Sequence, residues 1–79
     1  MDIGELGDII RHHRKISGLT RVECARLAGV GKTVVYDIEH GKASIQFSTL
    51  LRILKVLNIR IQFSSPLMDD FSGEKIQKL

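Results

Sequence analysis

Glycine residues divide most of this sequence into short segments, which limits it to brief helices joined by tight turns. Gly18, Gly29 and Gly41 each follow a stretch in which apolar residues recur every three or four positions, and glycine is favoured just beyond a helix C-terminus. Gly31 stands where a helix would begin and can act as its N-cap. The pattern predicts four helices, over residues 3–17, 20–28, 32–39 and 47–57.

Side chains at suitable spacings support each of these helices. Thr20 and Glu23 form a capping box, which places the start of the second helix at Thr20. The inward-facing residues that we expect are Leu6, Ile10 and His13 in the first helix, Cys24, Ala25 and Ala28 in the second, Val35 and Ile38 in the third, and Leu50, Leu54 and Leu57 in the fourth.

Residues 58–66, with the sequence NIRIQFSSP, depart from the helical pattern. Ile59, Ile61 and Phe63 alternate with polar residues, which is the two-residue period of a half-buried β-strand. Pro66 would end its hydrogen-bonded ladder. Because the sequence offers no second strand and a lone strand is unstable in water, the partner edge must come from another molecule.

The charge distribution suits a polyanionic partner. Residues 11–60 contain ten Lys or Arg and three Asp or Glu, a net charge of +7, whereas the 79-residue chain carries +3. Nucleic acid is such a partner, although an ordinary solvated surface gives the same composition. The single cysteine excludes an intrachain disulfide. With no apolar run of about 18 residues and an acidic start unlike a signal peptide, we expect a soluble intracellular protein.

No arrangement of side chains in the sequence predicts an enzyme or a metal site. GVGKT at 29–33 resembles the end of a phosphate-binding loop, but Arg26 stands where that motif needs glycine. His12 and His13 point to different sides of a helix and His40 is distant in sequence, so no zinc-ligand spacing results. We therefore predict no enzymatic activity, no cofactor and no metal ion.

Residues 20–39 have the pattern of a helix-turn-helix. The short turn from Gly29 to Gly31 sets two helices at a steep angle, so the second can enter a DNA major groove while the first crosses the phosphate backbone. Val35 and Ile38 would face inward. The outward positions of the second helix are polar, as contact with base edges requires, and they are Lys32, Thr33, Tyr36 and Asp37.

The segment GLTRVECARLAGVGKTVVYDIEHGK, residues 18–42, resembles the core of the Cro/C1-type (XRE) helix-turn-helix family. The resemblance covers residues 6–57, with the glycines, Thr20, Ala25 and Glu39 in register. Three positions depart from the family pattern: Arg21 replaces a glutamine, Gly31 replaces a serine and Cys24 replaces a core leucine.

This resemblance implies a lambda-repressor-like fold of four to five helices, in which Arg14 and Glu39 form a partly buried ion pair that locks the second helix of the motif. It also implies a DNA-binding repressor. Base contacts would come from Lys32, Thr33 and Asp37, whereas Tyr36 would reach either a base or a phosphate and Arg21 would lie close to bases and backbone alike. Phosphate contacts would come from Thr20, His40, Lys42 and Ser44.

The stretch STLLRILKVLNIRIQF is similar to the fourth helix and the C-terminal strand of HipB-type antitoxins within this family. In that group the strand pairs with its twin from a second subunit, so the resemblance implies that Ile59, Ile61 and Phe63 join a homodimer. It further implies an antitoxin that represses its own promoter and neutralises a HipA-type kinase toxin.

We therefore predict an all-α helix-turn-helix domain over residues 1–65, including a C-terminal β-strand that pairs across the homodimer, and a flexible or partly helical tail over 66–79. We expect a cytoplasmic protein of the bacterial nucleoid that binds double-stranded operator DNA and no membrane. Two other functions stay open. One is a stand-alone phage-type or metabolic repressor. The other is a protein-interaction module without DNA binding, an alternative that is consistent with the departures from the family pattern at Arg21 and Gly31.

Overall fold

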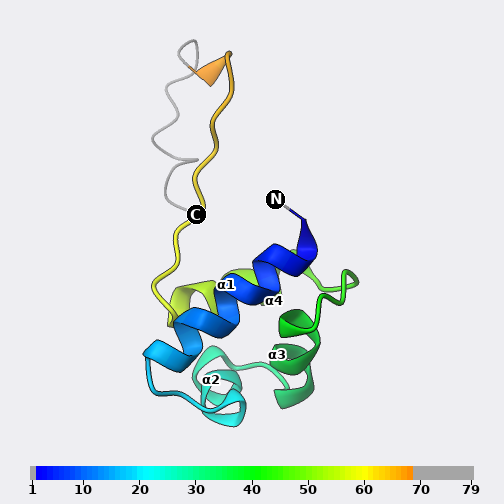
Figure 1. The fold of residues 1–79 in the computed structure, drawn as a ribbon, viewed down its shortest axis with the longest axis vertical. Coiled ribbons are helices and arrows are strands. Elements are labelled where there is room, and N and C mark those ends of the chain that lie inside the picture. The colour runs from blue at the N-terminus through cyan, green and yellow to red at the C-terminus, as the bar shows by residue number, and fades with distance from the viewer. Residues whose placement is uncertain (1, 69–79) are drawn as a thin grey trace.

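Within residues 2–68, which the computed structural model describes, the chain forms four α-helices (Figure 1). They are α1 (Ile3–Ile16), α2 (Arg21–Ala28), α3 (Lys32–Glu39) and α4 (Phe47–Val56). Each helix lies where the sequence predicted it, with ends that differ by at most one residue, so the all-helical class is confirmed. Most of the predicted tail, residues 69–79, lies outside the described residues.

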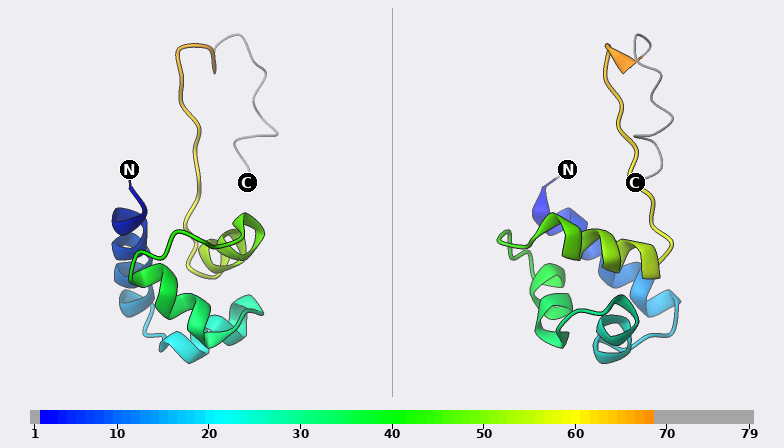
Figure 2. Two further views of the ribbon diagram at one scale, coloured as in Figure 1. Left: turned by 90° about the vertical axis from the view of Figure 1, so that its right-hand side faces the viewer. Right: turned by 180° about the vertical axis from the view of Figure 1, so that it is seen from behind.

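The helices pack so that α3 is held from two sides. It contacts both α1 and α2, and α2 also contacts α4. Figure 2 shows α2 and α3 joined by a short turn at one end of the helical body. The turn between them is therefore at the surface, and α3 has one side on the core and one side free.

Local hydrogen bonds fix the start of α2 as predicted. The amide of Glu23 donates to the Thr20 hydroxyl oxygen at 3.1 Å, and the amide of Thr20 donates to Glu23 Oε1 at 2.9 Å. The backbone and hydroxyl of Thr20 together lower the pKa of the Glu23 carboxyl. This capping box satisfies two amides that a helix start would otherwise leave without partners.

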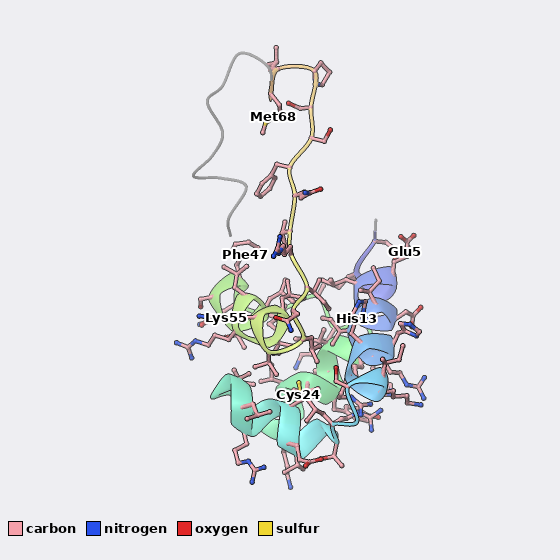
Figure 3. All side chains as sticks on the ribbon, turned by 90° about the vertical axis from the view of Figure 1, so that its left-hand side faces the viewer. Glu5, His13, Cys24, Phe47, Lys55 and Met68 are labelled. Carbon is pink, nitrogen blue, oxygen red and sulfur yellow. The ribbon has the colours of Figure 1, made fainter. Side chains whose placement is uncertain are left out.

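One hydrophobic core joins all four helices. Its buried side chains are Ile10, Cys24, Ala25, Ala28, Val35, Ile38, Leu50, Ile53, Leu54 and Leu57. Figure 3 shows the sulfur of Cys24 between the helices, and its burial raises the pKa of the thiol. Most of the predicted inward residues are in this core, and Ile53, which the leucine pattern did not include, is fully buried.

The expectation that His13 faces inward was wrong. The buried side of α1 follows Gly7, Ile10 and Arg14, which leaves His13 outside that stripe and exposed. Its Nδ1–H donates to the carbonyl oxygen of Ile9 at 2.7 Å, so the imidazole is satisfied on its own helix.

Gly7 permits the close approach of α1 to the end of α3. A Cβ atom at this position would collide with the carbonyl oxygen of Ile38 and would lie 3.1 Å from that of Glu39. Any side chain here would push the two helices apart. Gly4, one turn earlier, would bring a Cβ only to 3.3 Å from the Asp2 side chain.

A residue in the left-handed backbone conformation follows every helix of residues 2–68. Gly18, Gly29 and Gly41 have φ of 74°, 71° and 80°, and Asn58, which follows α4, has φ of 56°. Asparagine is one of the few residues that adopt this conformation readily without being glycine. Each helix thus ends at a signal encoded in its own sequence.

After α4 the chain leaves the helical body as an extended segment, seen in yellow and orange in Figures 1 and 2. Ile59 and Ile61 are half-buried against the core, whereas Phe63 is exposed. No β-ladder forms within residues 2–68, since a ladder needs a second edge, and the strand stays a prediction. In the same residues no helix combines the length and apolar character needed to cross a membrane.

Candidate nucleic-acid interface

The two sides of α3 differ sharply in exposure. Val35, Ile38 and Glu39 are buried against the other helices. The opposite side, here called the outer side of α3, consists of the exposed Lys32, Thr33 and Tyr36 and the partly exposed Asp37. All four are the positions that the sequence predicted to face outward, so α3 presents a polar surface on a rigid support.

Buried charges beneath α3 hold it to α1. Arg14 Nε donates to Glu39 Oε2 at 2.6 Å, and Arg14 Nη2 donates to Glu39 Oε1 at 3.0 Å. A third donor of Arg14, Nη1, reaches the carbonyl oxygen of Leu19 at 2.9 Å, in the loop before α2. The structure therefore brings together Arg14 and Glu39, the two residues of the expected ion pair. Through Arg14 the pair also connects α1 and α3 to the loop that precedes α2.

Both members of this pair are held in their charged forms. The hydrogen bond to Glu39 raises the pKa of Arg14. For Glu39, burial alone would raise the pKa, but the hydrogen bonds and positive charges of Arg14 and Arg21 outweigh it, so the pKa lies below its ordinary value. The carboxylate is consequently ionised while the pair is intact.

Arg21 is the second partner of Glu39, a contact that sequence reasoning did not anticipate. Its Nε donates to Glu39 Oε1 at 3.1 Å, and the guanidinium carbon lies over the Tyr36 ring, 5.4 Å from the ring centre. Its side chain is 36% exposed, compared with 7% for Arg14. Arg21, the first residue of α2, thus contacts both the buried side and the outer side of α3.

The aromatic ring of Tyr36 is also stacked on the next turn of α3. The ring centres of Tyr36 and His40 are 3.9 Å apart, with 20° between the planes. The Nδ1–H of His40 donates to the carbonyl oxygen of Tyr36 at 2.7 Å, which fixes the orientation of the imidazole. His40, predicted as a phosphate contact, is exposed at the C-terminal end of α3.

Asp37 is paired with a residue from the following loop. Lys42 Nζ lies 3.4 Å from Asp37 Oδ2, and the Lys42 amide donates to the Asp37 carbonyl oxygen at 2.9 Å. Together with Ser44, these residues line a hollow of about 270 Å³ between α3 and the start of α4, completed by Val34, Ile38, Ile45, Gln46 and Thr49. The structure therefore groups three of the predicted contact residues around one concave surface.

The N-termini of α3 and α4 differ from those of α1 and α2. Asp2 and Thr20 cap the first two helices with side-chain hydrogen bonds, whereas Gly31 and Gln46 provide none. Neither α3 nor α4 has an acidic residue in its first turn. Amides at such helix starts lack internal partners and carry positive partial charge, which favours anions.

Thr20 and Arg21 lie at the start of α2, and the remaining predicted contacts lie along α3 and the loop after it. Figure 3 shows Met68 far from these elements, at the end of the extended segment. Among residues 2–68, no group of three or more His, Cys, Asp or Glu side chains is arranged to hold a metal ion.

Sequence comparisons identify relatives of this chain. It is 34% identical, over 78% of its length and 82% of the relative's, to an uncharacterised HTH-type transcriptional regulator, y4mF, of Sinorhizobium fredii. It is 31% identical, over 77% of its length and 74% of the relative's, to the control protein C.SmaI of Serratia marcescens.

Solved structures share the fold. The restriction-modification controller protein C.AhdI of Aeromonas hydrophila superposes with a TM-score of 0.66 over 72% of this chain and 86% of that protein, at 24% identity. HipB in a complex with an O2 20mer superposes with a TM-score of 0.75 over 84% of this chain and 92% of that protein, at 18% identity.

A family model, HTH_3, described as helix-turn-helix, matches residues 10–63, which include α2, α3, α4 and the second half of α1. The match begins near the buried residue Ile10 and extends to Phe63 in the segment after α4. The resemblance inferred from the motif is thereby confirmed, and this chain belongs to the XRE-type helix-turn-helix family.

Proposed function

We propose that this protein is a DNA-binding transcriptional repressor that reads a specific operator as a homodimer and regulates its own promoter. The observation that carries the proposal is the polar outer side of α3, supported from beneath by the buried Arg14 and Glu39 pair. Two relatives more than 30% identical are named as a transcriptional regulator and a control protein, which supports a regulatory role.

Base recognition is assigned to the outer side of α3. Lys32 donates to guanine acceptors, and the Thr33 hydroxyl can donate or accept. Asp37 can accept from the amino group of a cytosine, and the nearby Lys42 ammonium offsets its repulsion by phosphates. Tyr36 offers both a ring and a hydroxyl to the groove.

Phosphate contacts are assigned to the residues that flank α3. Thr20 accepts the Glu23 amide through its hydroxyl oxygen and retains its O–H as a donor to phosphate. His40, Lys42 and Ser44 are exposed donors at the end of α3 and in the loop after it. The uncapped starts of α3 and α4 add positive partial charge to this arrangement. A protein of this kind acts in the bacterial cytoplasm, at the nucleoid.

Binding to the upstream region of its own gene tests the proposal. The parent chain should bind this duplex more tightly than a shuffled duplex, and binding should weaken steeply with salt because counterions are released. Lys32→Ala and Thr33→Ala should lose the discrimination and keep the fold. Lys15→Ala, which removes the same charge from the exposed end of α1, is the matched control for Lys32→Ala. Absence of binding to either duplex would instead favour an interaction module without DNA binding, and equal binding to both duplexes would mean DNA binding without sequence discrimination.

The homodimer is proposed to form through the segment after α4. Ile59 and Ile61 already pack on the core of their own chain, which leaves the backbone edge and the exposed Phe63 available to a twin segment. Apolar surface removed from water contributes roughly 25 cal/mol per Å². Pairing of two such strands would place two copies of α3 on a twofold operator.

Sedimentation distinguishes this interface from others. Phe63→Ser alters a side chain that is 46% exposed, so it should keep the helical fold and weaken the dimer. Ile61→Pro removes an amide donor of the ladder and should weaken it further. The control is Leu67→Ser, which alters another exposed apolar side chain beyond Pro66. A parent-like dimer in both Phe63→Ser and Ile61→Pro would place the interface elsewhere.

The protein partner that we propose is a HipA-type kinase toxin. The likeness to HipB covers 84% of this chain, and HipB also occurs in a solved complex with HipA, O2 and O3. This is a likeness of fold, and the 31% identity to a control protein supports a second candidate, a regulator without a toxin. Co-purification from the native host decides between them. A kinase bound in stoichiometric amount supports the antitoxin, and its absence supports the stand-alone regulator.

A further inference from the structure

The first residue of α2 is joined to the outer side of α3 by two separate contacts. Arg21 Nε donates to the buried carboxylate of Glu39 at 3.1 Å, while its guanidinium carbon lies 5.4 Å from the centre of the exposed Tyr36 ring. The Tyr36 ring is in turn stacked on His40 at 3.9 Å. A single arginine therefore connects a fixed group inside the domain to an aromatic side chain on its surface.

These contacts restrict what Arg21 can do. Its Nε is already used by Glu39 and its guanidinium carbon lies over the Tyr36 ring, so only the terminal amino groups remain for other hydrogen-bond partners. A planar guanidinium stacks on an aromatic ring and donates at its edge at the same time, which an ammonium group does not. In this geometry Arg21, fixed by Glu39, restricts the orientation of the Tyr36 ring.

We propose that Arg21 is a positioning residue, which holds the Tyr36 ring against His40 and acts on operator discrimination through Tyr36. The proposal rests on the proposed DNA-binding function and narrows the role expected of Arg21 from the sequence. Tyr36 is 49% exposed, so without such contacts its side chain would move among several rotamers and would order only on DNA. A ring that is already ordered contacts DNA at a lower entropic cost.

Replacing Arg21 leaves Glu39 its other partner, Arg14, so the contact with Tyr36 can be removed while the buried pair stays in place. Glu39 keeps two hydrogen bonds from Arg14 when Arg21 is replaced. Arg21→Gln therefore removes the guanidinium over the Tyr36 ring and leaves the buried pair of Arg14 and Glu39 intact. Arg26→Gln removes the same charge from the exposed last turn of α2, and no contact joins Arg26 to Glu39 or Tyr36 among the hydrogen bonds and ion pairs of residues 2–68.

The first measurement needs no DNA. Tyr36 is the only tyrosine and the chain has no tryptophan, so ring-current shifts of the His40 ring protons in NMR spectra report its stacking. Tyr36→Leu gives the unstacked reference. We expect Arg21→Gln to move the His40 shifts towards that reference, and Arg26→Gln to leave them at the parent values. Parent-like shifts in Arg21→Gln would overturn the proposal.

The second measurement uses the upstream duplex and a shuffled duplex at several salt concentrations. Arg21→Gln should lower affinity for the upstream duplex about two- to fivefold relative to Arg26→Gln, an effect typical of one cation–π contact. Arg21→Lys should behave like Arg21→Gln, because the charge alone does not hold the ring. The salt dependence should match that of Arg26→Gln.

A different pattern would assign Arg21 to the DNA backbone. The salt dependence of Arg21→Gln could have a slope smaller by about one than that of Arg26→Gln, while Arg21→Lys keeps the affinity of the parent. That result would mean a direct phosphate contact of Arg21 and would overturn the positioning role. Failure of the parent to distinguish the two duplexes would overturn the proposed function itself. The His40 shifts would then still decide whether Arg21 holds Tyr36.

Discussion

Two carboxylates on α3, only two residues apart, have opposite environments. Glu39 is fully enclosed and accepts hydrogen bonds from Arg14 and Arg21, the shortest of them 2.6 Å. Asp37 lies on the other side of the helix, 3.4 Å from a Lys42 side chain that is 58% exposed. One helix thus carries a buried charge network on its inner side and a loose surface pair on its outer side.

The difference separates stability from recognition. A buried carboxylate that loses its partner is left in a poorly solvated place, and this is costly. An exposed pair exchanges its partner for water or for another ligand at little cost. We therefore expect changes around Glu39 to alter the fold, and changes around Asp37 to alter what the surface binds.

Arg14→Ala should have the largest effect on stability. The variant removes two hydrogen bonds from Glu39 and one from the Leu19 carbonyl oxygen, and loss of one member of a buried pair costs about 3–5 kcal/mol. Arg21 remains as a partner of Glu39, which favours the lower end of that range. Urea denaturation of parent and variant measures the difference. A loss below about 1 kcal/mol would mean that solvent reaches this pair as freely as a surface one.

The contribution of Glu39 should depend on pH. Its pKa is lower in the folded chain than the ordinary value of 4.5, so the stabilisation is fully present above about pH 4.5 and is lost as the pH falls through the folded value. The difference in unfolding free energy between the parent and Glu39→Gln should therefore shrink on acidification. Glu23, whose pKa is also lowered, is present in both chains and cancels. A difference that stays constant down to pH 3 would contradict the assignment.

Gly7→Ala should have an intermediate effect, again on the inner side of α3. The new Cβ would meet the carbonyl oxygen of Ile38, so α1 must shift, at a cost of about 1–3 kcal/mol. Gly4→Ala is the matched control on the same helix, where only the Asp2 side chain must yield. Thermal melting of both variants should show a large decrease for Gly7→Ala alone. Equal melting temperatures would show that α1 is free to move away from α3.

Lys42→Met should have the smallest effect on the fold. The pair with Asp37 is exposed, and such pairs contribute about 0–1 kcal/mol. Operator affinity should fall nevertheless, because one phosphate contact is lost and the charge of Asp37 is no longer offset. Asp37→Asn combined with Lys42→Met should restore part of that affinity. A stability loss as large as that of Arg14→Ala would end the distinction between the two sides of α3.

The helices were predictable because their signals are local. Glycine positions, the Thr20 capping box and the apolar spacing of α3 and α4 each act within a few residues. His13 shows the limit of such periodicity, since spacing from Ile10 alone did not fix which edge of α1 is covered. The buried face depends on where α3 crosses α1, and that crossing depends on Gly7.

The candidate site was predictable as a set of positions but not as a set of contacts. The outward residues of α3 follow from helix geometry alone. The contacts of Arg21 with Glu39 and Tyr36 depend on the angle between α2 and α3, which no local pattern contains. The same holds for the hollow beside Asp37, because it needs the loop after α3 and the start of α4 to meet.

Because a residue in the left-handed conformation follows each of α1, α2, α3 and α4, the reversals at Gly18, Gly29, Gly41 and Asn58 cost little steric strain before any two helices meet. The unfolded chain can therefore adopt the bends of the native state without a large local cost. Small helical domains rich in local contacts fold in on the order of microseconds to milliseconds. Pairing of residues 59–63 between two chains would follow as a slower bimolecular step, with a rate set by protein concentration.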